Sequence, residues 1–494
     1  MVFFLRLCVF FVGIISIIFL SISHWLYKTF GNININQAIW HIKNVDLSIL
    51  MTVDPDFKIR CLKFSLFIFI LISFWFFLTF KYKFICNLIK KFLIHSRLKN
   101  KKVDLCISCY EYSSVKILFV VSLLLFSICI LKIDRQFDII SYIKEPNLPI
   151  ASEYIENNYS VPDIEAVVFK EKKNLVIVLA ESFENTFSNV DGISYTANID
   201  KVRNNAIKNF NMYNTSGTNW TIAAITGWFF GLPLKTPNGI NGNGYISKNG
   251  FLPHALSVFD VLQHNGFESV LVIGSDKRFY GMDQLFSMHG GFKILDKSAF
   301  EADGWNLAAN AGTSWGFNDS FVLARASEEY ARLKKQTKPF VLFIQTIDTH
   351  APNGYCPQLH KKFYDIRDAI VEADSNLGKF SEQFVEDDNT VYILLGDHLF
   401  MGSPQFLSNN MDRTIYNLFH GKLPLISKAK QHEKISAVDI APTLLHCAGG
   451  KWGNDKFGLG VSLFSDDHSL LQRDGISKFN SEIMKDSTFY SKFY

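Results

Sequence analysis

Three long apolar runs in the first third of the chain constrain its fold more than any other feature. They extend from about Val2 to Ser23, from Leu62 to Phe80 and from Val115 to Leu131. Each run is long enough for a helix to cross the hydrocarbon core of a bilayer, which takes roughly 20 residues. A cleavable signal peptide is the competing interpretation of the first run. No small-residue cleavage site follows Ile22 and further runs come after it, so we expect three transmembrane helices.

The charges between these runs predict their orientation. After the second run the chain carries Lys81, Lys83, Lys90, Lys91, Arg97, Lys99, Lys101 and Lys102. Because loops rich in Lys and Arg stay on the cytoplasmic side, we expect residues 81–114 and the N-terminus to be cytoplasmic. Everything after the third run then lies outside the cytoplasm. A further buried or re-entrant segment over Ile35 to Met51 is an alternative for the first connection.

These patterns divide the chain into three parts. We expect residues 1–135 to form the membrane region with its basic loop. Residues 136–170 form a polar linker that contains Pro149 and Pro162. Residues 171–494 are long enough for one large extracytoplasmic domain.

Composition excludes some classes of protein. A net charge of +4 gives no sign of nucleic-acid binding. Six of the eight cysteines lie in the membrane region, which argues against a disulfide-stapled domain. Cys356 and Cys447 could pair outside the cytoplasm, but the sequence does not place them together.

Short apolar runs alternate with helical patterns beyond residue 170. Four of these runs cover residues 174–180, 269–273, 339–345 and 390–395. They are almost continuously apolar, as expected for strands that are buried on both faces. Strands that alternate with helices predict an α/β domain with a mainly parallel central sheet.

Ionisable residues follow each of the four predicted strands. The segments are Glu181 to Glu184, Gly274 to Arg278, Asp348 to His350 and Gly396 to His398. In open α/β sheets, ligands bind at the carboxyl ends of the strands, where these segments meet. Each segment alone could be a turn or a helix N-cap. The set of four favours a functional site.

The loop from Asn214 to Gly227 is polar and contains glycine, and it turns into a helix near Trp220 or Thr221. A hydroxyl at a helix start faces unpaired N–H groups and the positive end of the helix dipole, where phosphate binds readily. Thr221 is therefore a candidate nucleophile for a phosphoryl group. Taken alone, this loop favours an ordinary N-cap.

The candidate metal site combines a hydroxyl, two carboxylates and an imidazole, from Thr221, Glu181, Asp397 and His398. These ligand types suit a divalent ion such as Mn²⁺ or Zn²⁺, which would lower the pKa of the hydroxyl. His350 could act as an acid or base or hold a phosphate oxygen, and Arg278 offers a second cation. The chemistry that this set suggests is phosphoryl transfer through a phospho-threonine.

The motifs resemble one family, in order, over most of residues 170–465. They are NLVIVLAESFENTF at 174–187, GTNWTIA at 217–223, RFYGMD at 278–283, WGF at 315–317, DTH at 348–350 and DHL at 397–399. They are similar to motifs of lipoteichoic acid synthases and membrane phosphoglycerol transferases of the alkaline phosphatase and sulfatase superfamily. The likeness is greatest to the phosphoglycerol transferase I family of osmoregulated periplasmic glucan synthesis.

The resemblance implies a function and a set of roles. Glu181, Thr221, Asp397 and His398 would bind the metal, with Mn²⁺ favoured over Zn²⁺ or Mg²⁺. Thr221 would be the nucleophile, His350 a catalytic residue near the substrate, and Arg278, Trp315 and Asp348 substrate-binding residues. The donor would be phosphatidylglycerol, diacylglycerol would leave, and a glucan or related hydroxyl would accept the phosphoglycerol. The implied location is a bacterial inner membrane, with the catalytic domain in the periplasm.

Departures from neighbouring families keep alternatives open. Lipoteichoic acid synthases carry His, Trp and Arg where this chain has Ile273, Tyr280 and Met282. Sulfatases need Cys-x-Pro-x-Arg, which the segment at Cys356 does not match. Phosphoethanolamine transferases share the Thr nucleophile. The alternatives are such a transferase, a phosphodiesterase of the same fold, or a non-catalytic membrane-anchored protein that binds a polymer.

Overall fold

The computed structural model describes most of the chain. The described residues are 2–30, 57–80, 100–137, 139–140, 152–204, 210–235, 246–247, 250–305, 312–313, 316–351, 354–355, 365–401, 407, 412–426, 430 and 433–494. They form two compact units, one of long helices up to residue 140 and one that contains all the described strands. The alternative segment over Ile35 to Met51 lies outside the described residues.

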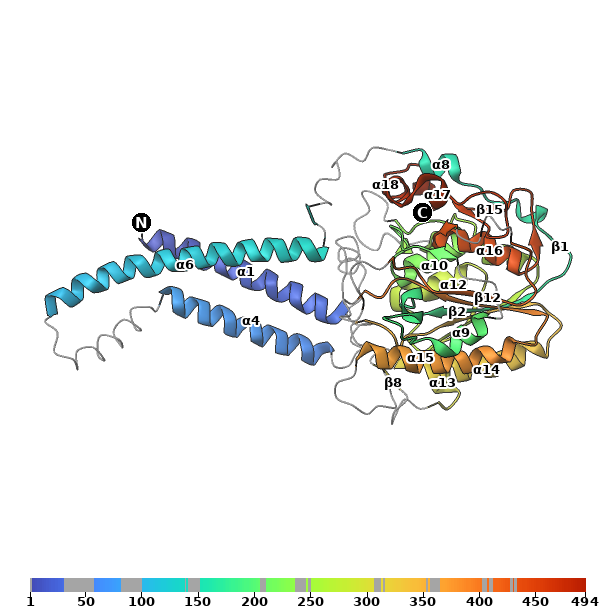
Figure 1. The fold of residues 1–494 in the computed structure, drawn as a ribbon, viewed down its shortest axis with the longest axis horizontal. Coiled ribbons are helices and arrows are strands. Elements are labelled where there is room, and N and C mark those ends of the chain that lie inside the picture. Colours follow the sequence, from blue (N-terminus) through green and yellow to red (C-terminus); the bar gives the residue numbers. More distant parts are fainter. Residues whose placement is uncertain are drawn as a thin grey trace. The chain divides into compact units, whose positions relative to one another are not determined.

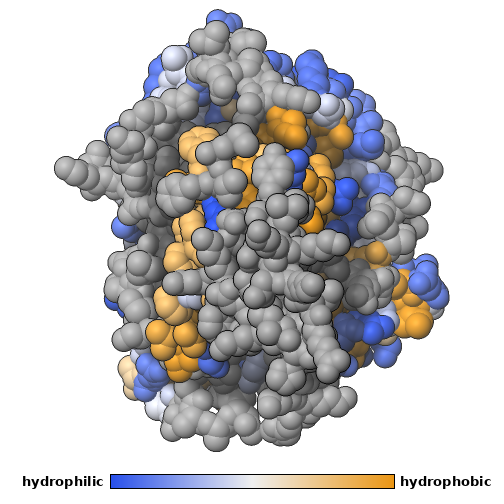
Figure 2. All heavy atoms as spheres, turned by 90° about the vertical axis from the view of Figure 1, so that its left-hand side faces the viewer, coloured by the Kyte–Doolittle hydropathy of each residue, from blue (hydrophilic) through white to orange (hydrophobic). Residues whose placement is uncertain are grey.

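The described residues of the first unit form three long helices: α1 (Val2–Phe30), α4 (Phe57–Phe80) and α6 (Asn100–Phe137). Their stretches Phe4–Leu26, Cys61–Phe80 and Val115–Phe137 are long and apolar enough to cross a membrane, as the sequence predicts. Their surfaces expose large apolar side chains, which water would not favour but lipid would. Hydrophobic side chains are visible on the side of the molecule that Figure 2 shows.

Close packing joins these helices. The Trp75 indole N–H of α4 donates to the Val9 carbonyl of α1 at 3.3 Å. A Cβ atom on Gly13 would lie 2.1 Å from the same indole nitrogen, so the small residue permits this approach. α6 begins at Asn100, so the end of the basic segment over residues 81–114 is helical. The cytoplasmic location of this segment stays a prediction.

A six-stranded sheet is the centre of the second unit (Figure 1). Its order is β12 (Asn417–His420), β11 (Thr390–Gly396), β2 (Asn174–Ala180), β10 (Phe340–Gln345), β6 (Glu268–Ile273) and β7 (Lys293–Leu295). All neighbours are parallel except β12, which runs antiparallel to β11. The four predicted strands and the mainly parallel sheet are confirmed.

Helices cover both faces of this sheet (Figure 1). One layer contains α9 (Ala197–Asn204), α13 (Lys297–Ala302), α14 (Asp319–Lys334) and α15 (Ile366–Ser381). The other contains α10 (Thr221–Phe230), α11 (Val258–His264), α12 (Met282–Met288) and α16 (Ile440–Cys447). Trp228 and Phe229 of α10 pack against Phe343 of β10, with ring centroids 6.2 and 6.4 Å apart.

Short elements complete the second unit. The helices are α8 (Tyr154–Asn158), α17 (Leu470–Asp474) and α18 (Ile476–Met484). The two-residue strands are β1 (Val168–Phe169), β3 (Asn211–Met212), β4 (Ile246–Ser247), β5 (Gly250–Phe251), β8 (Gly312–Thr313), β9 (Gly316–Phe317), β13 (Lys434–Ile435), β14 (Gly450–Lys451), β15 (Lys456–Phe457) and β16 (Gly460–Val461). The 3₁₀ turns include η2 (Asn185–Ser188), η3 (Phe279–Gly281) and η7 (Ala437–Asp439).

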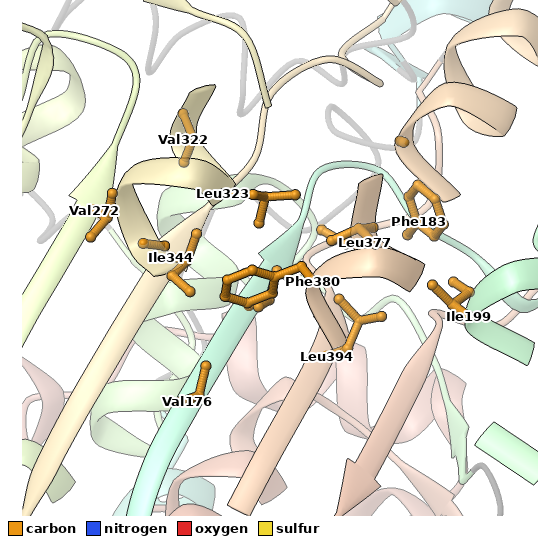
Figure 3. Close-up of a cluster of buried hydrophobic side chains, with 14 of the residues drawn as sticks. Val176, Phe183, Ile199, Val272, Val322, Leu323, Ile344, Leu377, Phe380 and Leu394 are labelled. Atoms are coloured by element: carbon orange, nitrogen blue, oxygen red, sulfur yellow. The ribbon is translucent and has the colours of Figure 1, made fainter. Parts of the chain in front are cut away.

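One apolar cluster fills the space between the sheet and α14 and α15 (Figure 3). Val176, Ile344 and Leu394 point from β2, β10 and β11 toward Leu323 of α14 and Phe380 of α15. The strand residues are 0% exposed. This packing fixes the strands whose carboxyl ends carry the predicted site.

Replacing Leu394 with Ala should destabilise the second unit by about 2–5 kcal/mol, because it leaves a cavity in this cluster. Replacing Val371 with Ala should cost less than about 0.5 kcal/mol, because Val371 is 48% exposed on α15. Denaturant unfolding of the full chain in detergent micelles measures both changes. Equal losses would contradict the assignment of Leu394 to the core.

Candidate active site

Glu181, Asp397 and His398 meet at the carboxyl ends of two adjacent parallel strands. Glu181 follows β2, and Asp397 and His398 follow β11, which pairs with β2 so that Gly396 lies beside Ala180. All three side chains are fully buried. One potential ligand atom of each lies within 4.8 Å of those of the other two. The structure therefore brings together these predicted metal ligands from positions far apart in the chain.

Ser182 and Gly396 fix the distance between the two strand ends. Ser182 has φ 54°, and this left-handed turn lets its N–H donate to Asp397 Oδ1 at 2.8 Å. Its hydroxyl donates to Glu181 Oε1 at 2.7 Å. A Cβ on Gly396 would lie 2.0 Å from the Phe183 carbonyl oxygen, so a larger residue would push the two segments apart.

The remaining polar atoms of the cluster suit a cation. Glu181 Oε2, Asp397 Oδ2 and His398 Nε2 are buried without a hydrogen-bond partner among the described residues. His398 Nδ1 donates to the Leu399 carbonyl at 2.9 Å, which leaves a lone pair on Nε2 in the neutral ring. Nε2 lies 3.3 Å from Asp397 Oδ2 and 3.7 Å from Glu181 Oε1. Buried polar atoms without partners are costly, and a divalent ion would satisfy all three.

Burial and mutual repulsion shift the acidities of this cluster. Burial raises the pKa of Glu181, and burial followed by the negative charge of Glu181 raises the pKa of Asp397 to about 6. Burial lowers the pKa of His398, but the charges of Asp397 and Glu181 outweigh it and the net shift is upward. The charged carboxylates are thus disfavoured while the site is buried and metal-free, and a divalent cation would stabilise them.

Thr221 is the first residue of α10, as the sequence predicts. Trp220, not Thr221, is the N-cap, and the Trp220 side chain makes no cap hydrogen bond, so the N-cap interpretation of Thr221 is wrong. The Thr221 hydroxyl is near enough to Glu181 and Asp397 to lower the pKa of each carboxyl, against the larger effect of burial. The candidate nucleophile therefore lies beside the candidate metal ligands.

His350 lies near the cluster as a neutral imidazole. Burial lowers the pKa of His350 to about 4, and the charges of His398 and Asp397 act on it in opposite directions. Its Nδ1 donates to the Ala351 carbonyl at 2.7 Å, so the lone pair is on Nε2. With this tautomer Nε2 can accept a proton, and the lowered pKa makes the ring a weaker base than a free imidazole.

The three predicted substrate-binding residues have different environments. Arg278 has 55% of its side chain exposed and forms a bidentate ion pair with Asp276, with Nε–Oδ1 3.0 Å and Nη2–Oδ2 2.5 Å. Asp348 is 1% exposed, and its Oδ2 accepts the Asp319 N–H at 3.0 Å. Trp315 lies outside the described residues. Substrate binding by these residues stays a prediction.

Several residues that support the site carry no signal of their own in the sequence. Glu184 is buried and binds Arg413 through two contacts of 2.7 Å, and Arg413 Nη2 donates to the Phe400 carbonyl at 3.0 Å. This ion pair joins the segment after Glu181 to the segment after His398. Residues that orient metal ligands contribute strongly to metal affinity.

Metal affinity should fall as the pH is lowered through about 6. Ligands bind metal in their deprotonated form, and the pKa of Asp397 is raised to about 6, so protons compete with the metal below that pH. The loss should approach about tenfold per pH unit. Calorimetric titration of the full chain with Mn²⁺ at pH 5, 6 and 7.5 measures it.

Asp397→Asn should weaken binding at pH 7.5, because it removes a charged ligand. Asp365→Asn, at the exposed N-cap of α15, serves as the control and should leave the affinity unchanged. An affinity that does not depend on pH in this range would contradict the ligand assignment.

Comparisons with known proteins find relatives that match part of this chain. Phosphoglycerol transferase I of Escherichia fergusonii is 28% identical over 309 residues, which cover 60% of this chain and 39% of the relative. The protein of the same name from Escherichia coli O127:H6 is 27% identical over 331 residues, which cover 64% of this chain and 41% of the relative. The chain thus matches about two fifths of the length of these relatives.

Two solved structures have similar chains. The lipoteichoic acid synthase LtaP from Listeria monocytogenes has 20% identity and a TM-score of 0.49, with 64% of this chain and 82% of that chain covered. The phosphoglycerol transferase GacH from Streptococcus pyogenes, in complex with sn-glycerol-1-phosphate, has 15% identity and a TM-score of 0.41, with 69% and 91% covered.

The family described as Sulfatase matches residues 173–450. This segment is more than half of the chain and contains Glu181, Thr221, Asp397 and His398. Members of this family typically bind a divalent metal, in agreement with the buried ligand set. The chain therefore belongs to the sulfatase family.

Proposed function

We propose that this protein transfers phosphoglycerol from phosphatidylglycerol to a hydroxyl acceptor through a phospho-threonine at Thr221. The observation that carries the proposal is the Thr221 hydroxyl at the start of α10, beside the buried carboxyls of Glu181 and Asp397. The curated relatives named phosphoglycerol transferase I support the choice of the transferred group.

Glu181, Asp397, His398 and the Thr221 hydroxyl would hold one divalent ion, with Mn²⁺ favoured over Zn²⁺ or Mg²⁺. When bound, such an ion neutralises charge on the phosphoryl oxygens and favours the alkoxide form of the hydroxyl. The chain's own contribution is to bury the ligands at fixed distances and to exclude water from them.

The reaction has two displacements at phosphorus. In the first, Thr221 Oγ forms a bond to phosphorus and the bond to the diacylglycerol oxygen breaks. The proton that Thr221 loses balances the one that diacylglycerol gains. In the second, the acceptor hydroxyl attacks the phospho-threonine and Thr221 regains its proton. His350, neutral with its lone pair on Nε2, is suited to take the proton of the acceptor hydroxyl.

The three N-terminal helices would keep this site near its lipid donor. Residues 1–135 would form the membrane region with residues 81–114 in the cytoplasm, and the second unit would be the periplasmic catalytic domain. The linker predicted at residues 136–170 is shorter than expected, because α8 and β1 within it already belong to the second unit. Anchoring raises the effective concentration of a membrane lipid at the site. The acceptor would be a periplasmic glucan or a related hydroxyl compound, and the location a bacterial inner membrane.

Incubating the full chain with Mn²⁺ in phosphatidylglycerol-containing micelles should add one phosphoglycerol group to Thr221. Intact-protein and peptide mass spectrometry measure the gain. Thr221→Ala should abolish it, because the attacking oxygen is lost. Thr226→Ala should retain it, because the Thr226 hydroxyl lies on the same helix but donates to the Ile222 carbonyl at 2.8 Å.

Any other result of this experiment would indicate a different function. A gain from phosphatidylethanolamine alone would indicate a phosphoethanolamine transferase. Lipid turnover with no acceptor but water would indicate a phosphodiesterase. Metal binding without any adduct or turnover would indicate a non-catalytic protein and would overturn the proposal.

A further inference from the structure

We propose that Asp319 is a positioning residue, whose carboxylate holds the segment Thr346 to His350 in place against the turn that carries Glu181. Asp319 does not belong to the motifs that predict the site, and it acts through His350. The kinetic part of this inference rests on the proposed function, whereas its structural part does not.

A reciprocal set of hydrogen bonds joins Asp319 to this segment. Asp319 Oδ1 accepts the Ile347 N–H at 2.7 Å, and Oδ2 accepts the Asp348 N–H at 3.2 Å. In return, the Asp319 N–H donates to Asp348 Oδ2 at 3.0 Å. Asp319 and Asp348 are each 1% exposed. Because water does not reach these groups, no solvent contact replaces the bonds if one is lost.

The opposite side of the same segment is attached to the Glu181 turn. The Glu181 N–H donates to Thr346 Oγ1 at 3.0 Å, and Thr346 Oγ1 donates to the Leu179 carbonyl at 3.2 Å. The Thr349 hydroxyl donates to the Glu181 carbonyl. The segment that ends in His350 is therefore held between the start of α14 on one side and the metal-ligand turn on the other.

A carboxylate is required for the α14 side of this arrangement. An ionised Asp accepts with both oxygens and donates with neither, so it matches two backbone N–H donors. Burial raises the pKa of Asp319 to about 7, whereas its hydrogen bonds from the Ile347 and Asp348 N–H groups act in the opposite direction and favour the carboxylate. Asn keeps the shape but turns an NH₂ group toward one of those donors, which leaves a buried N–H unpaired. Asp319 is also the first residue of α14, where the helix dipole favours a negative charge.

The consequence for the reaction is the position of His350. A catalytic base must lie within hydrogen-bond reach of the proton it takes, and a shift of about 1 Å can cost about 100-fold in rate. Loosening the α14 side leaves Thr346 and Thr349 attached to Glu181, so the metal ligands keep their places. Asp319 therefore affects the rate more than metal binding.

Asp374 provides a matched control for a purely structural role. It is 2% exposed on α15, and its carboxylate also accepts two backbone N–H groups, from Asn198 at 3.0 Å and from Ile199 at 2.9 Å. These bonds attach α9 and not the His350 segment. Asp374→Asn thus makes the same chemical change at another buried carboxylate that accepts two backbone N–H groups.

The experiment compares wild type, Asp319→Asn and Asp374→Asn as full chains in phosphatidylglycerol-containing micelles. With a soluble glucan oligosaccharide added as the acceptor, we expect kcat for phosphoglycerol transfer to fall at least about tenfold in Asp319→Asn, with KM and Mn²⁺ affinity nearly unchanged. Both variants should lose similar thermal stability, while Asp374→Asn keeps its kcat. Equal kcat values in the two variants at equal stability would overturn the inference.

Reaction of His350 with diethyl pyrocarbonate, followed by peptide mass spectrometry, gives a readout that needs no turnover. Asp319→Asn should raise the modification rate of His350 several-fold over that of Asp374→Asn. An unchanged rate would overturn the inference even if wild type does not use the lipid, an outcome that refutes only the proposed function. If Asp319→Asn does not fold, Asp319→Ser, which keeps one acceptor oxygen, is measured in the same way.

Discussion

The burial of two carboxylates beside one imidazole is the constraint on which the rest of the site depends. Such a cluster is unfavourable in the folded chain, since desolvation and repulsion both oppose the charged carboxyls. The parallel pairing of β2 with β11 nevertheless places both carboxylates together at the carboxyl ends of these two strands. The side chain and N–H of Ser182 then hold them in fixed orientations. The fold therefore keeps two carboxyls and one imidazole preorganised at one place, which is what a divalent cation needs.

The two histidines next to this cluster share one local arrangement but have opposite acid–base character. In each, Nδ1 donates to the carbonyl of the following residue, Ala351 or Leu399, which fixes the ring and leaves the lone pair on Nε2. His398 faces the carboxylates, which raise its pKa, whereas burial dominates at His350 and lowers its pKa. The two histidines therefore have different candidate roles because their surroundings differ. His398 is a candidate metal ligand, and His350 is a candidate base.

Much of the fold could be predicted from the sequence, because apolar runs report burial directly. The strands at 174–180 and 390–396 and the helix start at Thr221 follow from such runs and from what comes after them. β7 and β12 escaped prediction, because three or four residues carry too little periodicity. Asp319 could not be predicted as a supporting residue for another reason. In the sequence, an Asp that accepts distant backbone N–H groups cannot be distinguished from any other Asp at a helix N-terminus.

The position of Thr221 within its helix explains why a threonine can serve the chemistry here. An N-cap hydroxyl is occupied by the N–H of the second or third helical residue. Because the N-cap of α10 is Trp220, which makes no side-chain cap bond, the Thr221 hydroxyl has no such partner to satisfy. The N–H groups of a first helical turn have no partner within the helix, and phosphate oxygens are suited to accept from them. If α10 began one residue later, Thr221 would be the N-cap and its hydroxyl would bind a backbone N–H. The residue at which α10 begins therefore matters as much as the presence of a threonine.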